Sequence, residues 1–204
     1  MKIGYSWFER NRRRITRIVL PFGLLMVLLT RHSWPSDSVT AYIFKIAGIV
    51  LVVKGIIGRL WCTAYIGGRK NQELVTGGPY SMCRNPLYFF SFLAGLGVAF
   101  EFQNVLLILF YVGFFSFYYP LVISSEEKRL HSYFGDTFLR YKESVPAFFP
   151  NIFKLNLGGL QDVSYRLISK NFMDASLFII FIPIAWWVDS LFENGILHAY
   201  LILP

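Results

Sequence analysis

Apolar stretches long enough to cross a lipid bilayer, separated by polar segments, are the feature that most constrains this chain. The hydrocarbon core of a bilayer is about 30 Å thick, so a helix that rises about 1.5 Å per residue needs roughly 20 residues to cross it. Helices also satisfy their own backbone hydrogen bonds, which lipid cannot do for them. The sequence therefore predicts an all-α fold, a polytopic membrane helix bundle of about five transmembrane helices, at residues 15–30, 39–60, 87–100, 105–123 and 174–192.

The composition excludes an ordinary soluble domain, because 55% of the 204 residues are hydrophobic and only 16% are charged. The first apolar stretch follows a run of arginines, as in a secretory signal peptide, but no small-residue cleavage site closes it. We expect this stretch to be retained as the first span. Only residues 101–104 separate the third and fourth spans, so these two should form a tight antiparallel hairpin.

The net charge of +8 would suggest a nucleic-acid partner in a soluble protein, but in a membrane protein the distribution of charge matters more than its sum. With the N-terminus in the cytoplasm, Arg31 is the one basic residue in an outer loop. The basic residues on the cytoplasmic side are then those at positions 2, 10, 12, 13, 14, 17, 59, 69, 70, 84, 128, 129, 140, 142, 154, 166 and 170. This bias matches the positive-inside rule. It predicts a multi-pass protein of a bacterial inner membrane that contacts membrane lipids and not nucleic acid.

Two cytoplasmic segments join the predicted spans, and the second contains a helical pattern. The segment from Glu126 onward should be a helix that ends before Pro146 and Pro150. Its apolar residues recur every three or four positions with polar residues between them: Leu130, Phe134, Phe138, Tyr141 and Val145. We expect a cytoplasmic amphipathic helix over about 126–145 that lies against the bundle or the headgroups.

Neither a disulfide nor a metal centre is expected. Cys62 and Cys83 fall in or next to segments on the reducing side of the membrane. The three histidines, His32, His131 and His198, lack the spacing of a zinc or haem ligand set. We interpret all five side chains as structural.

The densest chemical signal is the turn-forming stretch 77–88, Gly-Gly-Pro-Tyr-Ser-Met-Cys-Arg-Asn-Pro-Leu-Tyr. It places Arg84 and Asn85 just before a predicted span, with Pro86 in the first helical turn, where a missing N–H costs nothing. A helix start offers backbone donors and a positive dipole end, which suit a carboxylate. Taken alone, Arg84 would equally suit phospholipid headgroups.

A second signal is the adjacent pair Glu126 and Glu127 at the cytoplasmic end of the fourth span. Two acids at a membrane boundary, beside a basic helix face, can hold an ammonium group or polarise a nucleophile. Taken alone, they would equally suit a solvated helix surface.

Together the two signals form a pattern: Gly-Pro-Tyr-x-x-x-Arg-Asn-Pro-x-Tyr at 78–88, then Glu-Glu-x-x-Leu-x-x-x-Phe-Gly-x-x-Phe-x-x-Tyr-x-x-x-Val-Pro-x-x-Phe-Pro at 126–150. This pattern closely resembles the isoprenylcysteine carboxyl methyltransferase family and the related phospholipid methyltransferases. The resemblance covers about residues 55–150, which would be the methyltransferase core. Residues 1–54 would be a two-span N-terminal anchor whose second span continues to about 60, and residues 151–204 an extension whose extra span we interpret as a further anchor.

The resemblance implies that S-adenosylmethionine is the cofactor, with S-adenosylhomocysteine as the product, in a pocket at the cytoplasmic side. Glu126 would bind its amino group, and Arg84 and Glu127 would be further contacts, with Glu127 as the base if the acceptor is an amine. The other cofactor-binding residues carried over by motif position are Gln72, Glu73, Leu74, Val75, Tyr80, Asn85, Pro86, Leu87 and Tyr88.

Two positions depart from the family pattern. Asn85 stands where many members have histidine, and an amide can donate and accept hydrogen bonds but cannot act as an acid or base near neutral pH. Val122 stands one helical turn before the glutamate pair, where eukaryotic isoprenylcysteine enzymes carry an arginine for the substrate carboxylate. This second difference argues against an isoprenylcysteine substrate.

The predicted function is therefore methyl transfer to a lipophilic small molecule or lipidated substrate at the cytoplasmic membrane face. The acceptor atom is left open among carboxyl, thiol and amine groups. One alternative is a non-catalytic lipid-binding or assembly protein on the same scaffold. Another is a reductase of the sterol type, which normally has a longer chain with more spans.

Overall fold

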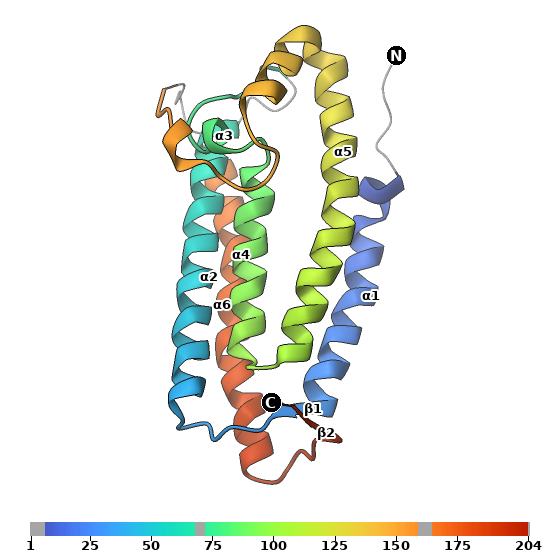
Figure 1. Cartoon of the computed structure of the whole chain (residues 1–204), viewed down its shortest axis with the longest axis vertical. Coiled ribbons are helices and arrows are strands. Elements are labelled where there is room, and N and C mark those ends of the chain that lie inside the picture. The colour runs from blue at the N-terminus through green and yellow to red at the C-terminus, as the bar shows by residue number, and fades with distance from the viewer. Residues whose placement is uncertain (1–6, 68–71, 159–164, 204) are drawn as a thin grey trace.

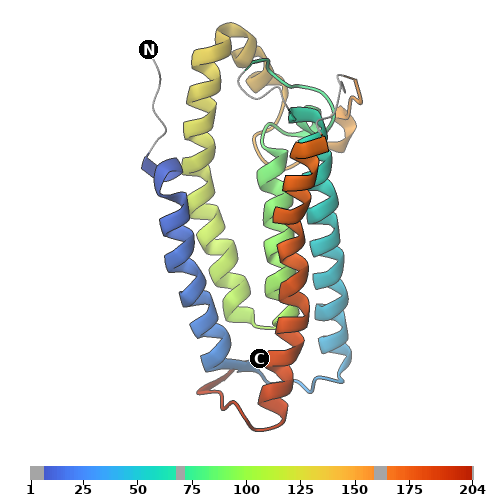
Figure 2. The same cartoon turned by 180° about the vertical axis from the view of Figure 1, so that it is seen from behind.

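Five long helices run along the longest axis of the molecule in the part of the chain that the structure describes, residues 7–67, 72–158 and 165–203 (Figure 1). In this computed structural model they are α1 (Trp7–Leu29), α2 (Val39–Ile66), α4 (Pro86–Glu101), α5 (Val105–Ser144) and α6 (Tyr165–Glu193). The short α3 (Pro79–Met82) and the 3-10 helix η1 (Ile152–Lys154) lie at one end of the bundle, which we call the motif end. The strands β1 (Thr30–His32) and β2 (Leu201–Leu203) lie at the other, the far end (Figures 1 and 2).

Three of these helices, α2, α5 and α6, are each long and apolar enough to cross a membrane. The other apolar helical segments are shorter: residues 17–29 within α1, and α4 with 16 residues. A membrane helix bundle is therefore supported by length and composition, while the number of five spans stays a prediction. The predicted hairpin of the third and fourth spans is present as α4 and α5 (Figure 1).

The segment at 126–145 that we expected to form a cytoplasmic amphipathic helix is the last part of α5, which continues to Ser144. No glycine or proline lies between residues 121 and 134 to end the helix, so hydrogen bonding continues past the apolar part. The chain changes direction instead at Gly135, whose φ of 50° and ψ of −129° interrupt the helical geometry. Glycine adopts this backbone conformation without the steric penalty of a Cβ atom.

The all-α prediction missed one short parallel pairing at the far end. Strands β1 and β2 align Thr30 with Leu201 and His32 with Leu203. A three-residue strand carries too little alternation to be recognised in a sequence. The pairing ties the end of α1 to the segment that follows α6.

Helices α2 and α4 pack with their backbones in close approach. A Cβ atom on Gly97 would lie 2.6 Å from the carbonyl oxygen of Gly48, and one on Gly55 would lie 2.6 Å from the Cβ atom of Ala94. Small residues at such positions allow two helices to approach within van der Waals contact of their main chains. The α2–α4 pair is therefore the most closely packed part of the bundle and supports the motif end.

Helix α6 shares a hydrophobic core with α2. Val52 and Ile56 of α2 and Ala175 of α6 are buried together, with Phe178 and Ile182 packed against them. Both views show α6 running beside α2 and α4 along most of its length (Figures 1 and 2). The segment interpreted as an added anchor is thus integrated into the bundle.

The α4–α5 connection is buried and held by side-chain hydrogen bonds. Trp186 Nε1 donates to Glu101 Oε2 at 2.9 Å, and Trp34 Nε1 donates to Gln103 Oε1 at 3.0 Å. Asn104 Oδ1 caps α5 by accepting from a backbone N–H at its start. These bonds satisfy polar groups that would otherwise be buried at a cost.

Candidate active site

The turn that carries the first motif is held in one conformation by Gly78 and Ser81. Gly78 has a φ of 58°, and a Cβ atom there would lie 2.4 Å from the ring of Tyr65. Ser81 Oγ donates to the Gly78 carbonyl at 2.6 Å and accepts from the Asn156 N–H at 2.9 Å. Only glycine fits this position, so the sequence fixes where α3 begins.

Arg84 and Glu127 form an ion pair that joins the two motifs. Arg84 Nε and Nη2 lie 2.9 and 2.8 Å from Glu127 Oε1, and Lys142 Nζ lies 3.0 Å from Glu127 Oε2. The side chains of Arg84 and Glu127 are about nine-tenths buried, whereas that of Lys142 is half exposed. Each carboxylate oxygen of Glu127 is therefore paired with a cation, and these ion pairs offset the free-energy cost of burying the carboxylate.

Arg84 and the neighbouring Asn85 also hold the segment that follows α5. Arg84 Nη1 donates to the carbonyl oxygens of Lys142 and Val145 at 2.7 and 2.5 Å. The Arg84 N–H donates to the Pro146 carbonyl at 2.8 Å, and Asn85 Nδ2 donates to the Ala147 carbonyl at 2.9 Å. The two residues therefore fix residues 142–147 against the start of α4.

Glu126 contacts the first motif through Tyr88. Tyr88 Oη donates to Glu126 Oε2 at 2.8 Å, and Arg129 Nη2 lies 3.3 Å from Glu126 Oε1. The ring of Tyr88 also packs edge-on against that of Tyr119, with centroids 5.4 Å apart. The predicted meeting of the Tyr80–Tyr88 stretch with Glu126 is thus present in the structure.

Tyr80 lies behind this contact with its ring buried beside Cys62 and Tyr65. Its backbone carbonyl accepts from Tyr141 Oη at 2.7 Å, but its own hydroxyl is buried without a hydrogen-bond partner among the described residues. Burial raises the pKa of Tyr80 well above its usual value, with Cys62 and Glu126 adding to the effect. The phenol is therefore a neutral donor with an unused hydrogen bond.

The comparisons with known proteins identify the family of the chain. The family model described as phospholipid methyltransferase matches residues 38–137, which include both α4 and the glutamate pair. The cobalt-zinc-cadmium resistance protein CzcN of Cupriavidus metallidurans is 31% identical over 198 residues, covering 97% of this chain and 91% of that protein. The chain belongs to the phospholipid methyltransferase family.

A second protein similar to this chain is the nickel-cobalt-cadmium resistance protein NccN of Alcaligenes xylosoxydans xylosoxydans. It is 39% identical over 148 residues, which cover 72% of this chain and 68% of that protein. No solved structure matches the chain significantly. The resemblance seen in the motifs is confirmed at the level of the family.

The motif residues fit the cofactor expected for a phospholipid methyltransferase family member. A buried Tyr80 hydroxyl without a partner leaves a donor unsatisfied, at a cost of about 1–3 kcal/mol unless a ligand accepts from it. A carboxylate at Glu126, held by Tyr88, is an acceptor suited to an ammonium group. The Glu126 carboxylate also helps to raise the pKa of the Tyr80 phenol, so donor and acceptor are close enough to interact electrostatically.

Not all of the residues predicted to bind the cofactor lie close to Tyr80, Tyr88 and Glu126. Val75 and Leu87 pack against the cluster of Cys62, Tyr65 and Tyr80, and Asn85 and Pro86 are buried at the start of α4. The side chains of Gln72 and Glu73 are exposed, and that of Leu74 is half-buried. The first part of the predicted set therefore lies nearer the protein surface than the rest.

Sequence reasoning missed Lys142, Arg129 and Tyr141 as parts of this site. Tyr141 bonds to the first motif and Lys142 pairs with Glu127 across the kink at Gly135, so no local spacing indicates these two contacts. Arg129 lies three residues after Glu126 in the same helix, a spacing that could have indicated their ion pair. Tyr141 stands in the apolar helical pattern and was interpreted as a packing residue, yet its hydroxyl bonds to the Tyr80 carbonyl. Burial also raises the pKa of Cys83 to about 12, so that thiol stays protonated.

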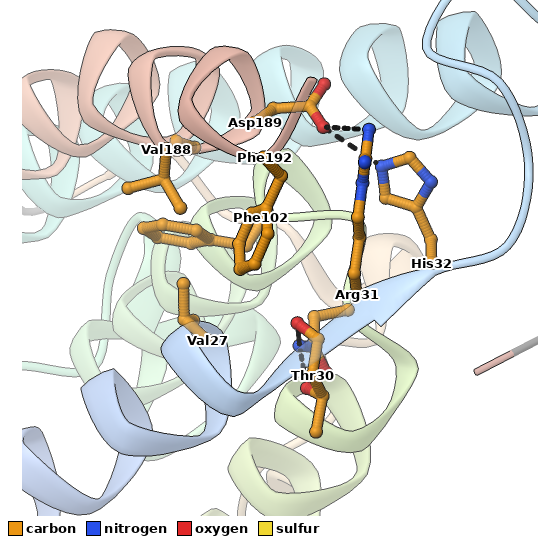
Figure 3. A pocket seen from close by; sticks show the side chains of 10 residues that line it. Val27, Thr30, Arg31, His32, Phe102, Val188, Asp189 and Phe192 are labelled. Carbon is orange, nitrogen blue, oxygen red and sulfur yellow. Dashed lines mark hydrogen bonds and ion pairs between the residues drawn. The ribbon is translucent and has the colours of Figure 1, made fainter. Parts of the chain in front are cut away.

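A small pocket at the far end of the bundle is separate from the motifs. Figure 3 shows Arg31 and His32 of β1 pointing toward Asp189 of α6, and His32 Nε2 lies 3.2 Å from Asp189 Oδ1. His32 Nδ1 bonds to the Trp34 carbonyl at 2.7 Å. Because β1 and α3 lie at opposite ends of the molecule, this pocket is not part of the candidate site (Figure 1).

Proposed function

We propose that this chain is an S-adenosylmethionine-dependent methyltransferase that acts on a lipophilic acceptor at the cytoplasmic face of a bacterial inner membrane. The observation that carries the proposal is the Tyr88–Glu126 hydrogen bond, which brings both family motifs together beside the buried Tyr80 hydroxyl. The positive-inside distribution of lysine and arginine supports placing this end in the cytoplasm.

When bound, S-adenosylmethionine supplies an electrophilic methyl group. The protein's part in such a displacement is to align donor and acceptor and to exclude water. Glu126 would hold the amino group, oriented by Tyr88 and Arg129. The Tyr80 hydroxyl would donate a hydrogen bond from the buried side.

For Arg84 and Glu127 the geometry favours a positioning role. Glu127 is paired with two cations, Arg84 at 2.8 Å and Lys142 at 3.0 Å, and Arg84 also donates to backbone carbonyls of the segment after α5. Such a pair fixes the wall of the site. If the acceptor is an amine, Glu127 would be the candidate general base among the motif residues.

Cofactor binding is the direct test. Glu126→Ala in detergent should lose measurable S-adenosylmethionine binding in calorimetry, because the ammonium group loses its charged partner. Glu143→Ala removes an exposed acid from the end of α5 and should bind like the unaltered protein. Unchanged affinity in the Glu126 variant would count against the site, and no binding by the unaltered protein would favour the non-catalytic alternative.

The acceptor class is tested by labelling. Purified protein incubated with radiolabelled S-adenosylmethionine and a total bacterial lipid extract should transfer label to an organic-soluble product, and Glu126→Ala should not. Alkali treatment then distinguishes methyl esters, which release methanol, from N- and S-methyl products. Label confined to the aqueous fraction would contradict a lipophilic acceptor.

The names of the relatives suggest the setting in which this activity serves the cell. CzcN and NccN are named as resistance proteins for cobalt and cadmium among other metals. We propose that methyl transfer by this chain contributes to metal resistance through a modified membrane component. A host lacking the gene should grow less well in cadmium or cobalt, and the unaltered gene should restore growth. Restoration by Glu126→Ala would show that any resistance role is independent of methyl transfer.

A further inference from the structure

A turn at the motif end, residues 149–157 around η1, exposes five large apolar side chains outside the long helices. They are Phe149 at 75%, Ile152 at 67%, Phe153 at 94%, Leu155 at 43% and Leu157 at 64%. We call this segment the apolar turn. Exposed apolar surface gathered in one place costs free energy in water and marks a surface that contacts a partner.

The apolar turn is not a loose connection, because its backbone is bonded to the first motif. The Asn151 N–H donates to the Met82 carbonyl at 3.0 Å, and the Asn156 carbonyl accepts from the Gly78 N–H at 2.6 Å. The Asn156 N–H is bonded in turn to Ser81 Oγ. The polar backbone therefore faces α3 while the apolar side chains remain exposed.

The position of the apolar turn indicates what covers it. Both views place η1 beside α3, on the outside of the bundle next to α2 and away from α1 and α5 (Figures 1 and 2). If α2, α5 and α6 cross the bilayer, as their length and hydropathy allow, a segment at this height lies where the headgroups meet the acyl chains.

The chemistry of the turn matches that region. Between residues 145 and 158 the one charged residue is Lys154, and no acid occurs. Lysine beside large aromatic and aliphatic side chains is typical of interfacial anchors, since the stem lies in the apolar layer while the ammonium group reaches anionic headgroups. Lys154 is exposed, and its Nζ donates one hydrogen bond to the Ser144 carbonyl, which leaves two N–H groups for a headgroup. A membrane surface rich in anionic phospholipid would accommodate the apolar side chains in its acyl layer and the Lys154 ammonium group among its headgroups.

We propose that the apolar turn inserts into the bilayer leaflet at the motif end, with Phe153 below the headgroups and Lys154 among anionic ones. This anchor fixes the height of α3 relative to the membrane surface, because the same turn holds Gly78 and Met82. The inference rests on the bilayer placement of the bundle and not on methyl transfer.

Spin labels on single introduced cysteines test the depth directly. Cys62 and Cys83 are fully buried, so the unaltered protein should take up little label and need not be altered. Phe153→Cys is compared with Phe117→Cys, which is 82% exposed on the apolar part of α5, and Asp136→Cys, which is exposed near the end of α5. Each labelled protein is reconstituted into phosphatidylcholine vesicles with and without phosphatidylglycerol, and collisions with oxygen and with a water-soluble nickel chelate are measured.

The label at 153 should resemble the one at 117, with several-fold more oxygen and several-fold less nickel contact than the one at 136, and should move deeper with phosphatidylglycerol. Nickel contact at 153 equal to that at 136 would overturn the proposal. Low contact with both reagents would overturn it in favour of a protein partner. A water-exposed label at 117 would contradict the bilayer placement itself, whatever the enzyme binds.

Discussion

At the scale of single residues, the Tyr80 hydroxyl separates a structural role from a ligand-binding one. Tyr80→Phe removes a buried donor without a partner, so the ligand-free protein should gain up to about 1–3 kcal/mol. If the hydroxyl bonds to the cofactor, the same variant should bind S-adenosylmethionine roughly tenfold more weakly, since about 1.4 kcal/mol is a factor of ten. Melting in detergent and calorimetry measure the two effects. A variant that is both more stable and equally tight in binding would contradict the proposed contact.

The ion pair at Glu127 gives a second residue-scale prediction. Arg84→Gln leaves a buried carboxylate short of its main partner and should destabilise the protein by about 3–5 kcal/mol. Lys142→Gln removes the half-exposed partner and should cost only about 0–1 kcal/mol, because solvent screens that contact. Apparent melting temperatures of the two variants in one detergent test the order. Equal losses would show that Lys142 carries as much of the network as Arg84.

The motif residues could be predicted from the sequence because their family spacing is fixed, whereas their partners could not. The contact between Glu126 and Tyr88 agrees with the family resemblance, which implied that both residues bind one cofactor. The carbonyl oxygens of Val145 and Ala147 accept from Arg84 and Asn85, and backbone acceptors leave no mark in a sequence. The same holds for the orphaned Tyr80 hydroxyl, since burial is a property of the folded chain.

At the scale of elements, the close approach of α2 and α4 depends on glycine. Gly97→Ala would place a Cβ atom 2.6 Å from the Gly48 carbonyl oxygen and should destabilise the bundle by roughly 1–3 kcal/mol. Gly113→Ala is the matched control, since nothing lies within 4 Å of a Cβ atom there, and it should stabilise α5 by about 0.5–1 kcal/mol. Thermal unfolding in detergent measures both. A stabilising effect at both positions would contradict the packing.

Helix boundaries were predictable where they coincide with the boundary of an apolar stretch. They were not predictable where a helix continues into polar sequence. The starts of α2, α4 and α5 follow their first apolar residues, and Asn104 caps α5. Helices α5 and α6 instead extend well beyond the hydrophobic part at the motif end. Amphipathic sequence continues the backbone hydrogen bonding outside lipid, so hydropathy alone cannot place these ends.

At the scale of the whole molecule, orientation decides whether the motif end meets the cytoplasm. Asp37 lies at the far end between β1 and α2, and Asp136 lies near the end of α5, and both side chains are exposed. With the motif end inside, Asp37→Cys should react with a membrane-impermeant thiol reagent in intact spheroplasts, and Asp136→Cys only after lysis. The buried native thiols should contribute little background. The reverse pattern would place the glutamate pair and Tyr80 on the outer face, away from cytoplasmic S-adenosylmethionine, so it would overturn the proposed function together with the topology.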